Sequence, residues 1–273
     1  MAERANTARH ESGLDRRLWG GGMLANLFGK TRQNESEAPE GMRIYAVGDI
    51  HGRADLLNDL LNLVADDMND ADDLVVRLVF LGDYVDRGFH SKEVIERLVE
   101  LKTQTSGLHF LKGNHEQAMA QFLNDASVGH VWLEYGGLET LHSYGVHCVR
   151  SSSDTGAFEQ AREELNEKLP ESHRQFLSEL EISVEYGDYF FVHAGVRPGV
   201  ALADQDEEDL LWIRDDFIRS NAKHEKVIVY GHTPSESPVD KAARIGVDTG
   251  AYMTGRLTAV ALQDRDRYFI STD

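Results

Sequence analysis

Short runs of apolar residues, bounded by glycine and other turn-forming residues, recur along the 273-residue chain. Runs of this kind are typical of strands that are buried on both faces of a parallel sheet. In the first half, the stretches 42–52, 78–88 and 108–116 each begin with such a run. From 182 onward the pattern is mostly β, and it predicts strands at 182–186, 189–192, 227–230, 243–248, 257–262 and 268–270.

Apolar residues at helical spacing lie between the predicted strands. Residues 54–68 predict a helix that covers one face of the sheet, and a second helix begins at Ser91, a candidate N-cap. Further helices are predicted at 116–123 and over 158–180, where Pro170 interrupts the pattern. We therefore expect an α/β fold of two sheets packed face to face with helices outside. Residues 41–273 form the expected domain, and the polar stretch 1–40 is predicted to be a flexible tail.

The charge balance narrows the range of partners. The chain has 28 Lys and Arg residues against 47 Asp and Glu residues, a net charge of −19, and no basic stripe interrupts it. This argues against nucleic acid or an anionic membrane as the main partner. Cys148 is the single cysteine, which excludes an intrachain disulfide or a cysteine zinc cluster and predicts a reducing cytoplasm. No apolar run approaches the length of a membrane-spanning helix.

Five of the predicted strands share a chemical feature where they end. Each runs into a small residue flanked by a side chain that can bind a hard metal ion. One Gly-Asp pair after a strand is usually a plain turn, but a fivefold repetition requires another explanation. The ends of strands are also where open α/β sheets place ligands, and a buried carboxylate there requires a cation. The candidate ligands are Asp49, His51, Asp83, Asn114, His193 and His232.

The chemistry of these six donors predicts two metal ions. Oxygen and imidazole donors suit Mn, Fe or Zn better than an ion that prefers thiolate. Six donors are too many for one catalytic tetrahedral ion, which keeps a position open. Two divalent ions that share a carboxylate account for all six, and such pairs generate a hydroxide for in-line phosphoryl displacement. Because Mg²⁺ prefers oxygen ligands, we expect Mn²⁺, with Fe or Zn as alternatives.

Five motifs in the chain resemble the phosphoprotein phosphatase branch of the calcineurin-like metallophosphoesterases. They are GDIHG at 48–52, GDYVDRG at 82–88, GNHE at 113–116, HAG at 193–195 and GHT at 231–233. The resemblance covers residues 44–262 and implies a four-layer αββα metallophosphoesterase sandwich. The HAG motif is similar to the bacterial serine/threonine phosphatases, since eukaryotic members usually have HGG. By this resemblance Asp49, His51 and His193 hold one metal, Asp83 bridges, and Asn114 and His232 complete the second.

The resemblance also implies the roles of four residues that do not bind metal. His115 is the general acid that protonates the leaving oxygen, and Asp86 orients it. Arg87 grips phosphate oxygens, and Arg214, in the looser motif LLWIRDDF, resembles the second phosphate-binding arginine of bacterial members. Lys112 stands where many relatives have arginine and is left out of the predicted site.

Three functions compete at this point. The favoured hypothesis is a monomeric serine/threonine protein phosphatase that acts on a phosphoprotein or phosphopeptide by direct attack of a metal-bound hydroxide. A symmetrical bis(5'-nucleosyl)-tetraphosphatase is the alternative. Its third motif usually ends in Asp, whereas this chain has Glu116, which favours the phosphoprotein substrate. A non-catalytic binding scaffold is the third hypothesis, and the complete set of predicted ligands and catalytic residues argues against it.

Overall fold

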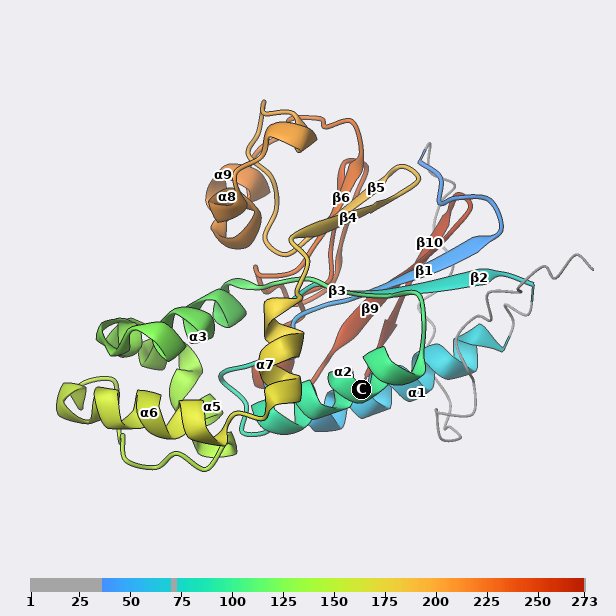
Figure 1. The fold of residues 1–273 in the computed structure, drawn as a ribbon. Coiled ribbons are helices and arrows are strands. Elements are labelled where there is room, and N and C mark those ends of the chain that lie inside the picture. The colour runs from blue at the N-terminus through green and yellow to red at the C-terminus, as the bar shows by residue number, and fades with distance from the viewer. Residues whose placement is uncertain (1–35, 70–72, 273) are drawn as a thin grey trace, which may run out of the picture.

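The computed structural model describes residues 36–69 and 73–272. In this part of the chain the strands form two sheets (Figure 1). The strands are β1 (Met42–Val47), β2 (Val75–Phe80), β3 (Leu108–Phe110), β4 (Ser183–Tyr186), β5 (Tyr189–Val192), β6 (Val227–Tyr230), β7 (Val239–Lys241), β8 (Arg244–Gly246), β9 (Thr258–Gln263) and β10 (Asp266–Ser271). The α-helices are α1 (Ala54–Met68), α2 (Ser91–Gln104), α3 (Asn114–Asn124), α4 (Gly129–Trp132), α5 (Leu138–Ser143), α6 (Phe158–Lys168), α7 (Glu171–Ser178), α8 (Glu207–Trp212), α9 (Asp215–Ile218) and α10 (Ala251–Thr254).

Each sheet has a parallel centre. The first has the order β10-β9-β1-β2-β3, in which β1 runs parallel to β2, and β2 to β3. The second has the order β4-β5-β6-β8-β7, in which β6 runs parallel to both β5 and β8. The short edge strand β7 was not predicted, because its sequence, VDK, contains no apolar run. Loops that carry ligands follow β1, β2, β3, β5 and β6.

Alternating side chains of the strands divide the interior into three hydrophobic cores. Ile44 of β1 lies between the two sheets, whereas the next residue, Tyr45, faces α1 and α2. In β5, Phe191 likewise lies between the sheets, and Phe190 faces α8 and α9. Three cores separate four layers, with helices on both outer faces (Figure 1). The prediction of a mixed α/β sandwich with two face-to-face sheets is therefore confirmed.

The predicted helix bounds agree with the observed ones to within two residues: α3 begins at 114 rather than 116, and α7 ends at 178 rather than 180. The helix at 54–68 has the predicted bounds, and the break near Pro170 separates α6 from α7. The second helix does begin at Ser91, but its N-cap residue is His90. The prediction that Ser91 caps the helix is wrong, because its buried hydroxyl instead accepts a hydrogen bond from the backbone N–H of Asp86, at 3.1 Å.

Helices α3 to α7 lie between β3 and β4 in the sequence, and we call residues 114–178 the helical insertion. Figure 1 shows α3, α5 and α6 grouped beyond one end of the sheets, whereas α1 and α2 run along the first sheet. Among the described helices, none combines the length and apolarity that crossing a lipid bilayer requires.

The predicted tail falls partly outside the described residues. Residues 1–35 lie outside them. Residues 36–40 are described, and the backbone N–H of Ala38 donates to the carbonyl of Asp264 at 2.8 Å. Ala38 is buried, and the N–H of Glu37 donates to the carboxylate of Asp188 at 2.9 Å. The last residues before β1 are therefore packed against the sheets.

Candidate metal centre

Backbone strain is concentrated in the loops that follow the strands. Among the described residues, six other than glycine have a positive φ, a conformation that is unfavourable for a side chain with a Cβ atom. One is Asp264, in the turn before β10. The other five are predicted site residues or their motif neighbours. They are His51 (46°), Asp83 (51°), Asp86 (72°), Arg87 (67°) and His232 (62°). Strain of about 1–3 kcal/mol per residue is typical of functional sites, where the surrounding structure maintains it.

Two glycines show how closely these loops approach one another. A Cβ atom on Gly113 would lie 2.2 Å from Oδ1 of Asp83, and one on Gly231 would lie 2.1 Å from Oδ1 of Asp49. Any larger residue would displace a carboxylate. The glycine that precedes each donor in the sequence therefore lets the loops from both sheets meet at one point.

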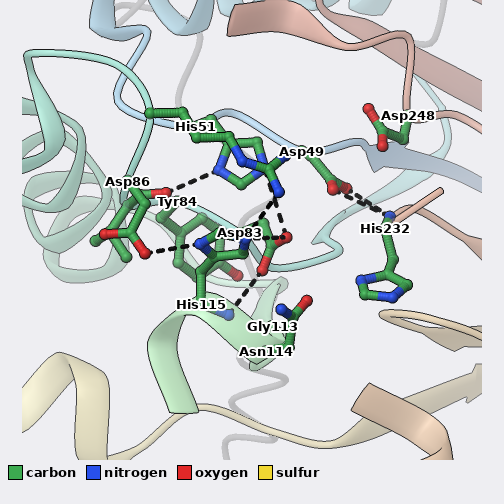
Figure 2. Close-up of polar contacts among 12 residues, drawn as sticks. Asp49, His51, Asp83, Tyr84, Asp86, Gly113, Asn114, His115, His232 and Asp248 are labelled. Carbon is green, nitrogen blue, oxygen red and sulfur yellow. Dashed lines mark hydrogen bonds and ion pairs between the residues drawn. The ribbon is translucent and has the colours of Figure 1, made fainter. Parts of the chain in front are cut away.

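Asp83 is the centre of the site. Its Oδ2 atom lies 3.6 Å from Nε2 of His51, and its Oδ1 atom lies 3.4 Å from Nε2 of His193. Two groups of possible metal ligands share this carboxylate: one joins it to His51 and His115, the other to His193 and His232. All of these side chains are buried, and Figure 2 shows the carboxylate of Asp83 between His51 and His115.

Hydrogen bonds to the backbone fix the tautomers of two histidines. Nδ1 of His51 lies 2.8 Å from the carbonyl oxygen of Val85, and Nδ1 of His193 lies 2.8 Å from that of Leu81. A carbonyl oxygen can only accept, so each Nδ1 carries the proton. Each neutral ring then directs the lone pair of Nε2 toward Asp83. This is how proteins orient histidines that bind metals.

His193 belongs with the second group of donors. Its Nε2 lies 3.0 Å from Oδ1 of Asn114 and 3.1 Å from Nδ1 of His232. The resemblance implied that His193 binds the first ion together with Asp49 and His51, and the structure places it beside Asn114 and His232 instead. Burial lowers the pKa of His193, so its Nε2 is an acceptor that faces another acceptor, the amide oxygen. A shared cation would resolve this contact.

The electrostatics of the site also fit metal ions. Asp49 accepts the backbone N–H of His232 at 3.0 Å from each oxygen, as Figure 2 shows. Burial and the neighbouring carboxylates of Asp248 and Asp83 raise the pKa of Asp49 well above its usual value. Nε2 of His232 is buried and has no hydrogen-bond partner among the described residues. Clustered carboxylates and a buried, unpartnered imidazole nitrogen are the surroundings that divalent cations require.

The proposed general acid and its partner form a close pair. Nδ1 of His115 donates to Oδ2 of Asp86 at 2.7 Å, and both residues are buried (Figure 2). Burial lowers the pKa of His115, but the charges of Asp83 and Asp86 outweigh it, and the net pKa is raised. The backbone N–H of His115 also donates to Oδ1 of Asp83, at 3.1 Å. The ring is thus held beside the central carboxylate.

The guanidinium of Arg87 lies beside the rings of His51 and His115. Its guanidinium donates to Nε2 of His51 at 2.9 Å, and its Nη2 lies 3.1 Å from Nε2 of His115. It also stacks on the ring of Tyr252, 4.7 Å from the ring centroid, and the edge of this ring packs against His51. Tyr252 was missed by the sequence analysis, because an aromatic residue shortly after IGVDTGA carries no specific signal. Its ring fixes the plane of the guanidinium.

Arg214 lies between α8 and α9 and is the N-cap residue of α9. The two aspartates that follow it are engaged elsewhere: Asp215 pairs with Arg219 at 2.9 Å, and Asp216 with Arg197 at 3.0 Å. Within residues 36–69 and 73–272, no hydrogen bond or ion pair is found for the exposed guanidinium of Arg214. Burial and His193 lower the pKa of His232 to about 2, and the charge of Arg214 adds to this effect. Arg214 is therefore close enough to act electrostatically on His232 and His193, two of the candidate metal ligands.

Glu116 has a role that the sequence analysis did not assign. Its carboxylate accepts hydrogen bonds from the backbone N–H groups of Asp83, Tyr84 and Gly113, at 2.8–2.9 Å, and from that of Val85 at 3.2 Å. Glu116 is buried, and burial and Asp83 raise its pKa to about 7. It joins the second and third motifs, so its contribution is to the shape of the site rather than to contact with a substrate.

Lys112 and Asp248 do not belong to either group of possible metal ligands. Lys112, which was left out of the site, pairs with Glu207 at 3.2 Å. Asp248 stabilises a turn, because its Oδ1 accepts the backbone N–H of Gly250 at 2.8 Å. Its buried carboxyl also acts on Asp49, and burial raises the pKa of Asp248 to about 6. Asp248 therefore contributes to the field of the site as well as to the turn.

Comparison with known proteins agrees with this geometry. The family model described as calcineurin-like phosphoesterase matches residues 42–264. Serine/threonine-protein phosphatase 1 of Salmonella typhimurium is 30% identical over 235 residues, which cover 83% of this chain and 95% of the relative. The asymmetrical bis(5'-nucleosyl)-tetraphosphatase PrpE of Bacillus mycoides is 28% identical over 240 residues, which cover 80% of this chain and 90% of that protein.

A solved structure supports the fold. A Saccharomyces cerevisiae protein serine/threonine phosphatase with similarity to human phosphatase PP5 matches with a TM-score of 0.52 and 19% identity. The match covers 86% of this chain and 81% of that one. The matched family model spans all five motifs and every predicted site residue. The chain therefore belongs to the calcineurin-like phosphoesterase family, with the motifs of its phosphoprotein phosphatase branch.

Proposed function

We propose that the protein is a two-metal phosphomonoesterase that removes phosphate from phosphoserine and phosphothreonine in protein substrates. The observation that carries this proposal is the pair of His115 and Asp86, 2.7 Å apart and beside the central carboxylate Asp83. A serine or threonine alkoxide is a poor leaving group, which requires a proton in the transition state. A buried acid whose pKa is raised meets this requirement.

The residues have distinct roles in the proposed mechanism. His51 would hold one ion, Asn114, His193 and His232 the other, with Asp83 between them and Asp49 near the first. When bound, such ions polarise phosphoryl oxygens and lower the pKa of water, so that a nucleophile exists at neutral pH. The guanidinium groups of Arg87 and Arg214 orient the phosphoryl oxygens. His115 delivers its proton to the departing oxygen, while Asp86 holds the ring in place.

Manganese is the proposed metal. The proposed ligand set contains three imidazoles besides two carboxylates and an amide, and Mg²⁺ prefers oxygen ligands and retains its waters. Iron or zinc would suit the same donors. We further propose that the protein acts as a monomer. We also propose that it acts in a reducing compartment, which the single free thiol of Cys148 supports.

A dinucleoside tetraphosphatase is the second candidate, because a relative with that name is 28% identical. That relative carries the asymmetrical activity in its name, whereas the sequence analysis considered the symmetrical one. The buried position of Glu116 weakens the argument that favoured the phosphoprotein substrate, because the side chain contacts backbone rather than a ligand. The pair of His115 and Asp86 supports a phosphoprotein substrate instead, since a nucleotide leaving group needs a proton less than an alkoxide does.

One experiment separates these functions. A single Mn²⁺-loaded preparation is given a phosphoserine peptide, a phosphotyrosine peptide and diadenosine tetraphosphate, and kcat/KM is measured for each. We expect the phosphoserine peptide to rank first. Diadenosine tetraphosphate in first place would establish the alternative, and its products would show the mode of cleavage: two ADP for symmetrical, ATP and AMP for asymmetrical. Binding of the peptide without turnover of any substrate would favour the scaffold.

A further inference from the structure

The carboxylate of Asp86 receives more hydrogen bonds than its role as partner of His115 requires. Nε1 of Trp132 donates to Oδ2 at 2.9 Å, the atom that also accepts from His115. The hydroxyl of Thr140 donates to Oδ1 at 2.6 Å. Both donors come from the helical insertion, Trp132 from α4 and Thr140 from α5, and both are buried. The two oxygens of Asp86 are therefore held in place by a segment outside the five motifs.

The same segment also holds the backbone of the motif. The N–H of Asp86 donates to the hydroxyl of Thr140 at 2.8 Å. The N–H of Arg87 donates to the carbonyl of Gly136 at 3.1 Å, and a Cβ atom on Gly136 would lie 2.5 Å from that N. Asp86 and Arg87 both have a positive φ, which an isolated loop would not maintain. Contacts from the insertion thus stabilise the strained turn that presents Asp86 and Arg87.

We propose that Trp132 and Thr140 are positioning residues for proton transfer: they fix the orientation of Asp86, and through it that of His115. This inference rests on the proposed phosphomonoesterase function. It gives the helical insertion, which lies outside the five motifs, a direct effect on one chemical step. The alternative is that the two hydrogen bonds only stabilise the fold, in which case every substrate would be affected alike.

Leaving-group dependence distinguishes these two roles. Phenolate from phenyl phosphate needs protonation more than nitrophenolate from p-nitrophenyl phosphate does. Trp132→Phe keeps an aromatic ring but removes the indole N–H, and Thr140→Val keeps the branched shape but removes the hydroxyl. We expect each to lower kcat/KM about tenfold on phenyl phosphate, the size of one lost hydrogen bond to a charged group, and less than about threefold on p-nitrophenyl phosphate.

Three further variants complete the experiment. Tyr144→Phe is the matched control, since it removes a buried hydroxyl of the same insertion that contacts His173 at 2.9 Å rather than Asp86. It should leave the ratio of the two substrates unchanged. Thr140→Ser restores the hydroxyl and should restore the wild-type ratio. In the His115→Asn background, Trp132→Phe should produce no further loss on phenyl phosphate, because both changes act on one step.

Every result of this experiment either supports or overturns the positioning role of Trp132 and Thr140. Metal content and thermal unfolding are measured for every variant, and Thr140→Val provides the test if Trp132→Phe does not fold. Equal losses on both substrates, or losses that add to those of His115→Asn, would overturn the positioning role. A wild-type enzyme that hydrolyses aryl phosphates but leaves the phosphoserine peptide intact would contradict the proposed function and leave this inference standing.

Discussion

Nδ1 of His115 lies 2.7 Å from Oδ2 of Asp86, and the two side chains are almost fully buried beside the shared carboxylate Asp83. A hydrogen bond this short between an imidazole and a buried carboxylate fixes the ring and raises its basicity. Nε2 of the same ring is on the side of Arg87 and Asp83, where a phosphoryl group would be bound. A leaving oxygen bound there would therefore face Nε2, the nitrogen from which the proposed general acid would deliver its proton.

The first prediction concerns this acid. His115→Asn should lower kcat/KM on a phosphoserine peptide by roughly 10² to 10⁴, the usual contribution of general acid catalysis. The loss on p-nitrophenyl phosphate should be much smaller, because nitrophenolate leaves without a proton. Asp86→Asn should show the same selectivity in weaker form. Equal losses on the two substrates, with metal content retained, would mean that the proton comes from another group.

The second prediction concerns the metals. Dialysis against a chelator should abolish activity, and Mn²⁺ should restore it better than Mg²⁺, because the site is rich in imidazole. Asp83→Asn should lower the bound metal more than Asn114→Ala, since Asp83 lies in both ligand groups. Elemental analysis of the purified variants gives the stoichiometry. Unchanged metal content in Asp83→Asn would contradict a shared ligand.

The third prediction concerns the two arginines. Arg87→Ala and Arg214→Ala should each weaken inhibition by inorganic phosphate about tenfold or more, since a charge-assisted hydrogen bond contributes about 1.5–3 kcal/mol. Both variants should retain their metal ions. Arg219→Ala is the control, because this exposed arginine is near Arg214 in sequence but pairs with Asp215. Phosphate inhibition that is unaltered in Arg214→Ala would remove this residue from the site.

The fourth prediction tests the structural role of Glu116. Glu116→Ala leaves the buried N–H groups of Asp83, Tyr84 and Gly113 without an acceptor. At about 1–3 kcal/mol for each unsatisfied group, the free energy of unfolding should fall by about 3 kcal/mol or more, measured by urea denaturation. Glu179→Ala, which removes an exposed partner of Lys102, should change it far less, because exposed ion pairs contribute little to stability.

Glu116→Asp tests whether this position selects the substrate. A shorter carboxylate should lower stability, because it cannot reach all of the backbone N–H groups. The order of preference among phosphoserine peptide, phosphotyrosine peptide and diadenosine tetraphosphate should not change. A switch of preference toward the dinucleotide would show that the residue at position 116 does select between phosphoprotein and dinucleotide substrates.

The sequence by itself determined the longer helices, most of the strands and the types of ligand. Apolar runs and helical spacing are local patterns, so the helix at 54–68 and the strands at 189–192 and 227–230 were predicted with the observed bounds. The donors Asp49, Asp83 and His232 were found because each follows a buried strand. Parallel strands bring their carboxyl ends together, and the local pattern was therefore sufficient to predict one shared site.

Only the tertiary structure decided how these donors are grouped and what holds them. His193 lies with Asn114 and His232 because of the direction in which its ring leaves β5, which no local pattern records. The contacts that Trp132 makes with Asp86, and Tyr252 with Arg87, join residues 46 or more positions apart. Such contacts depend on how whole layers pack. Their physical cause is the meeting of separate chain segments, so a single stretch of sequence cannot specify them.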